Sequence, residues 1–233
     1  TQNYGYFGGG LYPRGVGATG VIIEDCIFES NQGGFGGGVY LNSDSGTMSN
    51  CSFINNVVAT RGGGFYNNTE AGTVVTNCAF TENESESSRG GGVYNTASPS
   101  SYSNCVFTDN SASMSSGGGL QVRNTNDEFI HMTVTVTDCT FEGNFASSWG
   151  GGAVRTFTGS FHLLNCSFKN NTAANTGGAV NANGDAKRLI ITDCNFEENN
   201  AGGGWGGGLT IYGDSTFAII KGTTFKSNEA LTS

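Results

Sequence analysis

The feature that most constrains this chain is an internal repeat. The element Cys-x-Phe-x-x-Asn recurs seven times, and an eighth copy has Thr in place of Cys. Successive copies begin 25, 27, 27, 34, 27, 28 and 29 residues apart. The copies are Cys26–Asn31, Cys51–Asn56, Cys78–Asn83, Cys105–Asn110, Cys139–Asn144, Cys166–Asn171, Cys194–Asn199 and Thr223–Asn228. A fixed period of this length indicates a solenoid in which each repeat forms one coil.

A second element, Gly-Gly-(Gly/Ala) followed by an aliphatic residue or Phe, is linked to every copy. Its third residue is Gly10, Gly38, Gly64, Gly92, Gly119, Ala153, Ala179 or Gly208. Segments such as 21–23, 134–137 and 189–192 are short and rich in β-branched residues, which is typical of strands. We therefore predict an all-β fold, a parallel β-helix of about eight coils with roughly 27 residues each, occupying residues 1–233 as a single unit.

Three columns of the repeat predict how each coil is built. The residue three before each Cys, or before Thr223, is apolar and should point inward. The residue directly before each Cys is Asn or Asp, which favours a sharp corner. The last residue of the motif should form a ladder of stacked amides at the next corner. The ladder residues are Asn31, Asn56, Asn83, Asn110, Asn144, Asn171, Asn199 and Asn228.

The seven cysteines all occupy one position of the repeat. We expect reduced, buried thiols, because parallel side chains on stacked coils keep their Cβ atoms farther apart than a disulfide prefers. Bridges between neighbouring coils remain an alternative. No Cys-x-x-Cys occurs, and the two histidines, His131 and His162, are not neighbours in the repeat, so no metal site is predicted.

Charge and composition exclude several functions. The net charge of −9 argues against a nucleic-acid partner, and no apolar run is long enough for this segment to insert in a membrane. The carboxylates, Glu29 and Glu142 among them, are scattered rather than gathered over neighbouring coils. We therefore predict no catalytic residue, no cofactor and no metal.

One feature indicates binding. Tyr12, Tyr40, Tyr66 and Tyr94 follow the Gly element on successive coils and should stack as an outward aromatic strip that contacts a partner or a glycan, or else serves only as a stabilising ladder. After Gln121, the same column continues with Arg155, Asn181 and Thr210.

Three further groups of residues complete the candidates. Phe35, Trp149 and Trp205 lie in loops before the Gly runs, where they could cover the solenoid or pack on a second copy. The polar insertion at 123–128 should form a protruding loop. Asn67 and Asn170 are candidate glycosylation sites if the source is a secreting eukaryote.

The paired motifs resemble the repeats of the polymorphic outer-membrane proteins of chlamydiae. Phe-x-x-Asn matches in all eight coils, and Gly-Gly-Ala is literal at 151–153 and 177–179. This resemblance covers the whole chain. It implies a right-handed β-helix, display at the cell surface and an adhesive role.

We accordingly expect a non-enzymatic extracellular or cell-surface scaffold or adhesin, associated with the outer membrane if the source is bacterial. Its partner would be a protein or glycan at a cell surface, or copies of itself end to end. The chain would then be a segment of a longer passenger or a stacking subunit. The alternatives are a subunit of an extracellular filament and, ranked lower, a carbohydrate-active β-helix enzyme.

Overall fold

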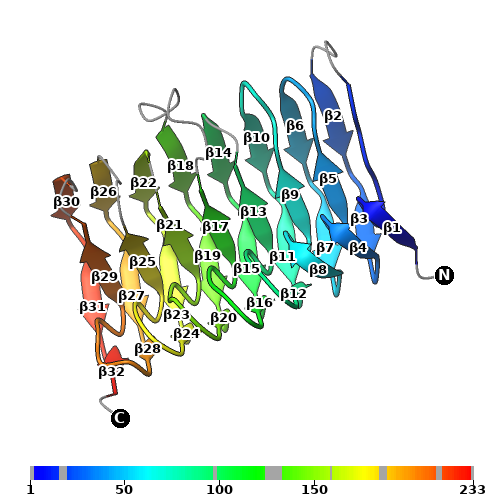
Figure 1. Ribbon diagram of the computed structural model, residues 1–233. Helices are drawn as coiled ribbons and strands as arrows, with labels where there is room; N and C mark the ends of the chain where they lie inside the picture. The colour runs from blue at the N-terminus through cyan, green and yellow to red at the C-terminus, as the bar shows by residue number, and fades with distance from the viewer. Residues whose placement is uncertain are drawn as a thin grey trace.

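The chain winds into a solenoid of stacked parallel strands. The computed structural model describes residues 3–15, 20–96, 99–123, 133–157, 159–183, 188–213 and 217–231. Within these residues every strand pairs in parallel with its equivalent in the next coil, and no helix occurs. Figure 1 shows the coils side by side from the N-terminus in blue to the C-terminus in red. The predicted parallel solenoid is confirmed.

A complete coil contributes one strand to each of four sheets, which contain eight, eight, nine and seven strands in the described residues. Sheet 1 contains β2 (Val21–Glu24), β6 (Gly46–Ser49), β10 (Thr73–Thr76), β14 (Ser100–Ser103), β18 (Thr133–Thr137), β22 (Ser160–Leu164), β26 (Arg188–Thr192) and β30 (Phe217–Lys221). Sheet 2 contains β3 (Ile27–Glu29), β7 (Ser52–Ile54), β11 (Ala79–Thr81), β15 (Val106–Thr108), β19 (Thr140–Glu142), β23 (Ser167–Lys169), β27 (Asn195–Glu197) and β31 (Thr224–Lys226).

The chain then turns into the other two sheets. Sheet 3 contains β1 (Tyr4–Phe7), β4 (Gln32–Phe35), β8 (Val57–Arg61), β12 (Glu84–Ser85), β16 (Ser111–Ala112), β20 (Phe145–Ala146), β24 (Thr172–Ala173), β28 (Asn200–Ala201) and β32 (Glu229–Ala230). Sheet 4 contains β5 (Val39–Leu41), β9 (Phe65–Asn67), β13 (Val93–Asn95), β17 (Leu120–Val122), β21 (Val154–Thr156), β25 (Val180–Asn183) and β29 (Leu209–Tyr212).

Left-handed backbone residues form the corners. The residue between sheets 1 and 2, Asp25 in the first motif, has φ between 51° and 54° in the first seven motifs, and Gly222 takes this position in the last one with φ of 61°. A second left-handed residue, such as Ser30 or Glu82, stands directly before the ladder Asn. The first Gly of each Gly run is also left-handed, as at Gly62 with φ of 69°. The first corner was predicted, whereas the second left-handed position was not.

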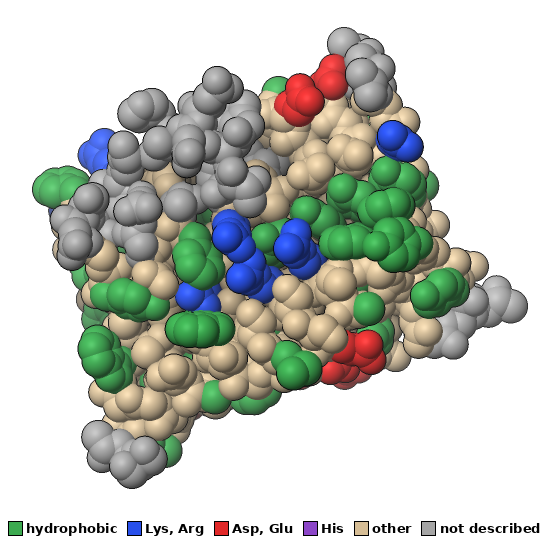
Figure 2. All heavy atoms as spheres, in the orientation of Figure 1, with side chains coloured by type: hydrophobic (Ala, Val, Ile, Leu, Met, Phe, Trp, Pro, Cys, Tyr) green, Lys and Arg blue, Asp and Glu red, His purple; other side chains and the backbone are tan. Residues whose placement is uncertain are grey.

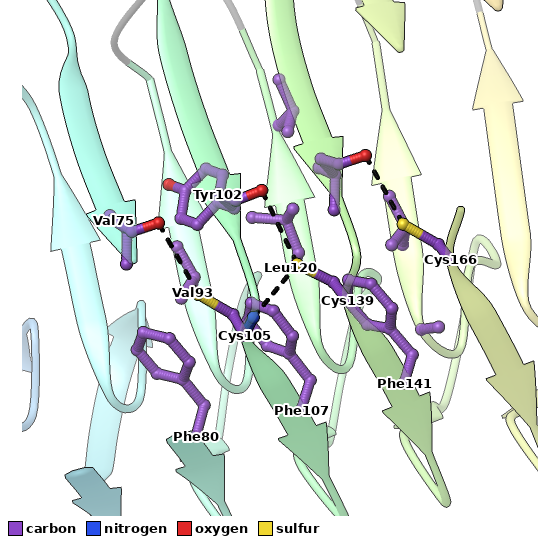
Figure 3. Packing of buried hydrophobic residues seen from close by; sticks show 14 of the residues in the cluster. Val75, Phe80, Val93, Tyr102, Cys105, Phe107, Leu120, Cys139, Phe141 and Cys166 are labelled. Atoms are coloured by element: carbon purple, nitrogen blue, oxygen red, sulfur yellow. Dashed lines mark hydrogen bonds between the residues drawn. The ribbon is translucent and has the colours of Figure 1, made fainter. Parts of the chain in front are cut away.

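The core is a set of ladders that run along the solenoid. Neighbouring Phe rings of sheet 2 stack with centroids 4.5 to 5.0 Å apart, which matches the spacing of paired strands. Figure 3 shows Phe80, Phe107 and Phe141 in this ladder, beside Cys105 and Cys139. The predicted inward column of sheet 1 is buried from Ile23 to Ile191, while Ile220 in the last coil is exposed.

The cysteine column lies against this core with unbridged thiols. All seven cysteines are free, six of them are buried, and Cys26 is half-buried. The Cys51 thiol donates to the Ser49 carbonyl at 3.2 Å, and the equivalent bond recurs along the column. The thiols therefore help to satisfy backbone carbonyls at the first corner.

The asparagine ladder is present as a continuous hydrogen-bonded column. The Asn110 side-chain oxygen accepts from both the backbone N–H and the amide group of Asn83, at 3.1 and 3.0 Å. The Asn110 amide group donates to Asn144 Oδ1 at 3.0 Å and to the Phe80 carbonyl at 2.8 Å. Asn110 thus ties three successive coils together, whereas Asn228 at the end of the ladder bonds, among the described residues, only to the coil before it.

Candidate functional site

The outer face of sheet 4 collects the residues that the sequence marks for binding. Strand registry places Tyr40, Tyr66 and Tyr94 one above another, followed by Gln121 and Arg155. The Tyr12 and Tyr40 rings stack at 5.1 Å, and the Tyr40 and Tyr66 rings at 4.6 Å. The predicted stacking of the tyrosine column is therefore observed.

The expectation of an exposed tyrosine strip is wrong. Tyr40, Tyr66 and Tyr94 are 8%, 7% and 0% exposed, and they form a small cluster of their own outside the main core. The reason is that side chains at the end of sheet 3 fold over them. The Phe35 ring lies 6.1 Å from the Tyr66 ring, and the Arg61 guanidinium lies 5.4 Å from the centre of the Tyr94 ring. Burial raises the pKa of Tyr40 to about 12.

The polar continuation of this column is buried as well. Gln121 accepts a hydrogen bond from Ser116 Oγ at 2.9 Å, and Thr210 donates to the Trp205 carbonyl at 2.9 Å. Within the segments that the structure describes, two atoms of this column are buried without a hydrogen-bond partner, namely Arg155 Nε and Asn181 Oδ1. The column thus contains unsatisfied polar groups next to fully satisfied ones.

Arg155 belongs to a group of three arginines around one aromatic ring. The guanidinium carbons of Arg155, Arg123 and Arg89 lie 4.0, 5.6 and 5.9 Å from the centre of the Phe157 ring. Burial lowers the pKa of Arg155 to about 10, and the charges of Arg89 and Arg123 act in the same direction, while Tyr212 opposes them. Arg155 therefore remains charged at neutral pH.

Two cavities lie side by side on this face and share Trp149 as a wall. One, of about 280 Å³, is lined by Arg89, Trp149, Arg155, Phe157 and Asn183. The other, of about 310 Å³, is lined by Trp149, Asn175, Thr176, Trp205 and Tyr212. Figure 2 shows basic side chains gathered in the middle of this face with hydrophobic side chains on both sides of them.

The remaining sequence candidates lie elsewhere. Asn67 is fully buried and donates to Asn95 Oδ1 at 2.6 Å, so the prediction that it is an accessible glycosylation site is wrong. Asn170 is exposed, and its modification stays a prediction. Of the 123–128 insertion only Arg123 lies within the described residues.

Acidic residues are spread over the solenoid in the described part of the chain. On the outer face of sheet 2, Glu197 pairs with Lys226 at 2.7 Å. The described residues contain no group of three or more His, Cys, Asp and Glu side chains placed to hold a metal ion. None of the described segments is a helix long and apolar enough to cross a membrane.

These ladders, corners and parallel registers define a β-helical repeat protein. The sequence model of the right-handed β-helix region matches residues 8–173, and the chain belongs to this family. The model of the Chlamydia polymorphic membrane protein repeat matches residues 165–183, which confirms the resemblance that the two motifs carry. No significant match to a curated protein or to a solved structure was found.

Sequence reasoning missed the arginine group and the paired cavities. Arg89, Arg123 and Arg155 come from three different positions of the repeat, so no single column shows that they meet. The signal that could have found them is a single charged residue, Arg155, in a column that is otherwise uncharged. A charge is rare at a buried position, and the neighbouring coils carry the uncharged Gln121 and Asn181 there.

Proposed function

We propose that this chain is an adhesive passenger segment of a cell-surface protein, in which a rigid β-helix presents binding side chains to a partner outside the cell. The observation that carries the proposal is the polymorphic membrane protein repeat at residues 165–183. Its Cys166, Phe168 and Asn171 occupy the same ladders as their equivalents in the other coils. The motifs of this repeat therefore recur in the other coils, which supports the proposal.

The geometry supports a passive scaffold. Hydrogen bonds and ring contacts repeat from coil to coil at nearly constant spacing, as the Phe ladder shows. A structure of this kind is stiff because each coil is clamped by both neighbours. Stiffness suits a segment that must hold a binding face away from a membrane. Membership of the β-helix family is compatible with enzymes as well, so the adhesive role depends on the repeat and on the face of sheet 4.

Surface display is tested on intact source cells with an antibody raised against this chain. We expect labelling without permeabilisation, loss of the label after brief protease treatment, and adhesion of beads coated with the full polypeptide to target cells. Label that appears only after permeabilisation would contradict surface display. The mass and shape of the native particle test the main alternative, since long fibres of a polypeptide near 24.1 kDa would identify a filament subunit.

A further inference from the structure

The arginine group on sheet 4 has no counter-charge among the described residues. The two ion pairs of the described residues, Lys169 with Glu198 and Lys226 with Glu197, both use lysines of sheet 2. Three guanidinium groups instead surround the Phe157 ring in a chain whose net charge is −9. Like charges held this close repel one another, so a bound anion would stabilise the arrangement.

Arg155 is built into the floor of the smaller cavity. The residue is only 2% exposed, it lines the 280 Å³ cavity, and its Nε atom has no hydrogen-bond partner in the described part of the chain. A buried donor without a partner is costly, and a ligand in the cavity that Arg155 lines would remove this cost. A planar guanidinium also matches the two oxygens of a carboxylate or of a sulfate group.

The adjoining cavity is suited to a different part of the same ligand. Trp149 and Trp205 are each 62% exposed and come from loops two coils apart, with Asn175 and Thr176 between them. Exposed tryptophans present π faces that attract the polarised C–H groups of a sugar ring, and the amide and hydroxyl between them offer hydrogen bonds. Because Trp149 lines both cavities, one ligand would lie across both.

We propose that this face binds a sugar that carries a carboxylate or a sulfate, with the anionic group held by Arg89, Arg123 and Arg155 and the sugar ring against Trp149 and Trp205. We call it the Arg–Trp face. The inference rests on the proposed function, because it names the ligand class for that adhesive surface.

Tryptophan fluorescence tests the proposal directly, because Trp149 and Trp205 are the two tryptophans of the chain. The full polypeptide is titrated with 3′-sialyllactose, with lactose 3′-sulfate and with unmodified lactose, up to about 10 mM. The two anionic sugars separate a carboxylate-specific site from a sulfate-specific one. We expect a saturable change in emission with at least one of them, weaker binding at high salt, and at least about tenfold weaker binding of lactose.

Variants separate specific binding from a general effect of charge. Arg89→Ala combined with Arg123→Ala should weaken binding of the anionic sugar by about tenfold or more. Both side chains are half-buried and contribute charge, since Arg89 lines the cavity and Arg123 lies over the Phe157 ring that forms part of its wall. Arg188→Ala removes an exposed arginine on sheet 1 and should leave affinity unchanged. Trp149→Ala should weaken binding of every sugar that the face accepts.

Three results would overturn the Arg–Trp face: no saturable change with either anionic sugar, equal binding of lactose, or wild-type affinity in the double arginine variant. Bead adhesion is measured in parallel with the same variants. Adhesion that survives the loss of sugar binding would refute this ligand and leave the adhesive function standing. Loss of adhesion by the Arg188→Ala control would point to misfolding, which circular dichroism of each variant detects.

Discussion

At the residue scale, the ladder asparagines concentrate more hydrogen bonds than any other side chain of the motif. Asn110 is fully buried and joins Asn83, Asn144 and the Phe80 carbonyl. No other small side chain offers a donor and an acceptor with this reach. The strict recurrence of Asn through eight coils follows from that demand.

Replacing one ladder asparagine should lower the free energy of unfolding more in a central coil than in the last coil. Asn110→Ala removes the side chain that bonds to the Asn83 backbone N–H and to the Phe80 carbonyl, and both groups stay buried. We therefore expect the free energy of unfolding to fall by about 3 kcal/mol or more. The matched change Asn228→Ala lies in the half-exposed last coil and should cost about 1 kcal/mol. Urea unfolding of both variants measures the difference. Equal losses would show that the ladder bonds contribute little beyond packing.

The buried Cys78 thiol and Tyr40 hydroxyl should make the free energy of unfolding decrease at alkaline pH. Burial raises the pKa of Cys78 to about 12 and that of Tyr40 to about 12. In the unfolded chain these groups lose their protons at lower pH, from about 9 for the thiol upward. The two protonated groups therefore contribute fully to the free energy of unfolding below about pH 9, and this contribution is lost as the pH rises towards 12.

The expected result is a urea midpoint that is constant near pH 8 and falls between about pH 9 and 11. Cys78→Ala should flatten part of this decline, because it removes one of the groups concerned. Ser52→Ala, which removes no titratable group, serves as the control and should leave the slope unchanged. A midpoint that does not fall with pH in the wild type would contradict the assignment.

At the element scale, the Gly runs form the turn from sheet 3 to sheet 4, and their three positions have different requirements. A Cβ atom on Gly118 would lie 2.4 Å from the Gly152 carbonyl oxygen of the next coil. A Cβ atom on Gly119 would lie 2.8 Å from the Ala153 oxygen and 3.1 Å from the Phe141 ring, and other coils carry Ala there. The second glycine is thus required by the close approach of two backbones.

A pair of substitutions separates these requirements. Gly118→Ala forces two rigid backbones apart and should destabilise by about 3 kcal/mol. Gly119→Ala recreates the natural Ala of Ala153 and Ala179 and should cost about 1 kcal/mol or less. Thermal unfolding of the two variants gives the comparison. A larger loss for Gly119→Ala would reverse the assignment of the close contact.

The parts of the fold in which one repeat position contacts the same position in neighbouring coils could be predicted from the sequence. The inward column, the first corner and the asparagine ladder each involve one position of the repeat in contact with its own copies. Burial of Tyr66 could not be predicted, because Phe35 comes from another position and covers it only after the turn is folded. Asn67 is similar, since a local glycosylation motif says nothing of stacking against Asn95.

At the scale of the whole molecule, stability is a sum of contacts between neighbouring coils. Every described strand pairs only with its equivalents in adjacent coils, so no contact joins distant parts of the solenoid. A repeat protein of this kind tolerates the removal of a whole unit far better than the removal of part of one. The tolerance depends on register, because a shift of one residue would turn core side chains outward.

Deletion of residues 79–105 tests this property. It removes 27 residues, which is one full period, and joins Cys78 to Val106 so that Phe53 would stack on Phe107. We expect a folded solenoid with the same β-sheet circular dichroism and a urea m-value lower by about one eighth, since one coil of eight no longer unfolds. Deletion of residues 79–91, about half a period, leaves the ladders without a common register and should prevent folding. If both deletions behaved alike, the coils would not be the units from which this solenoid is assembled.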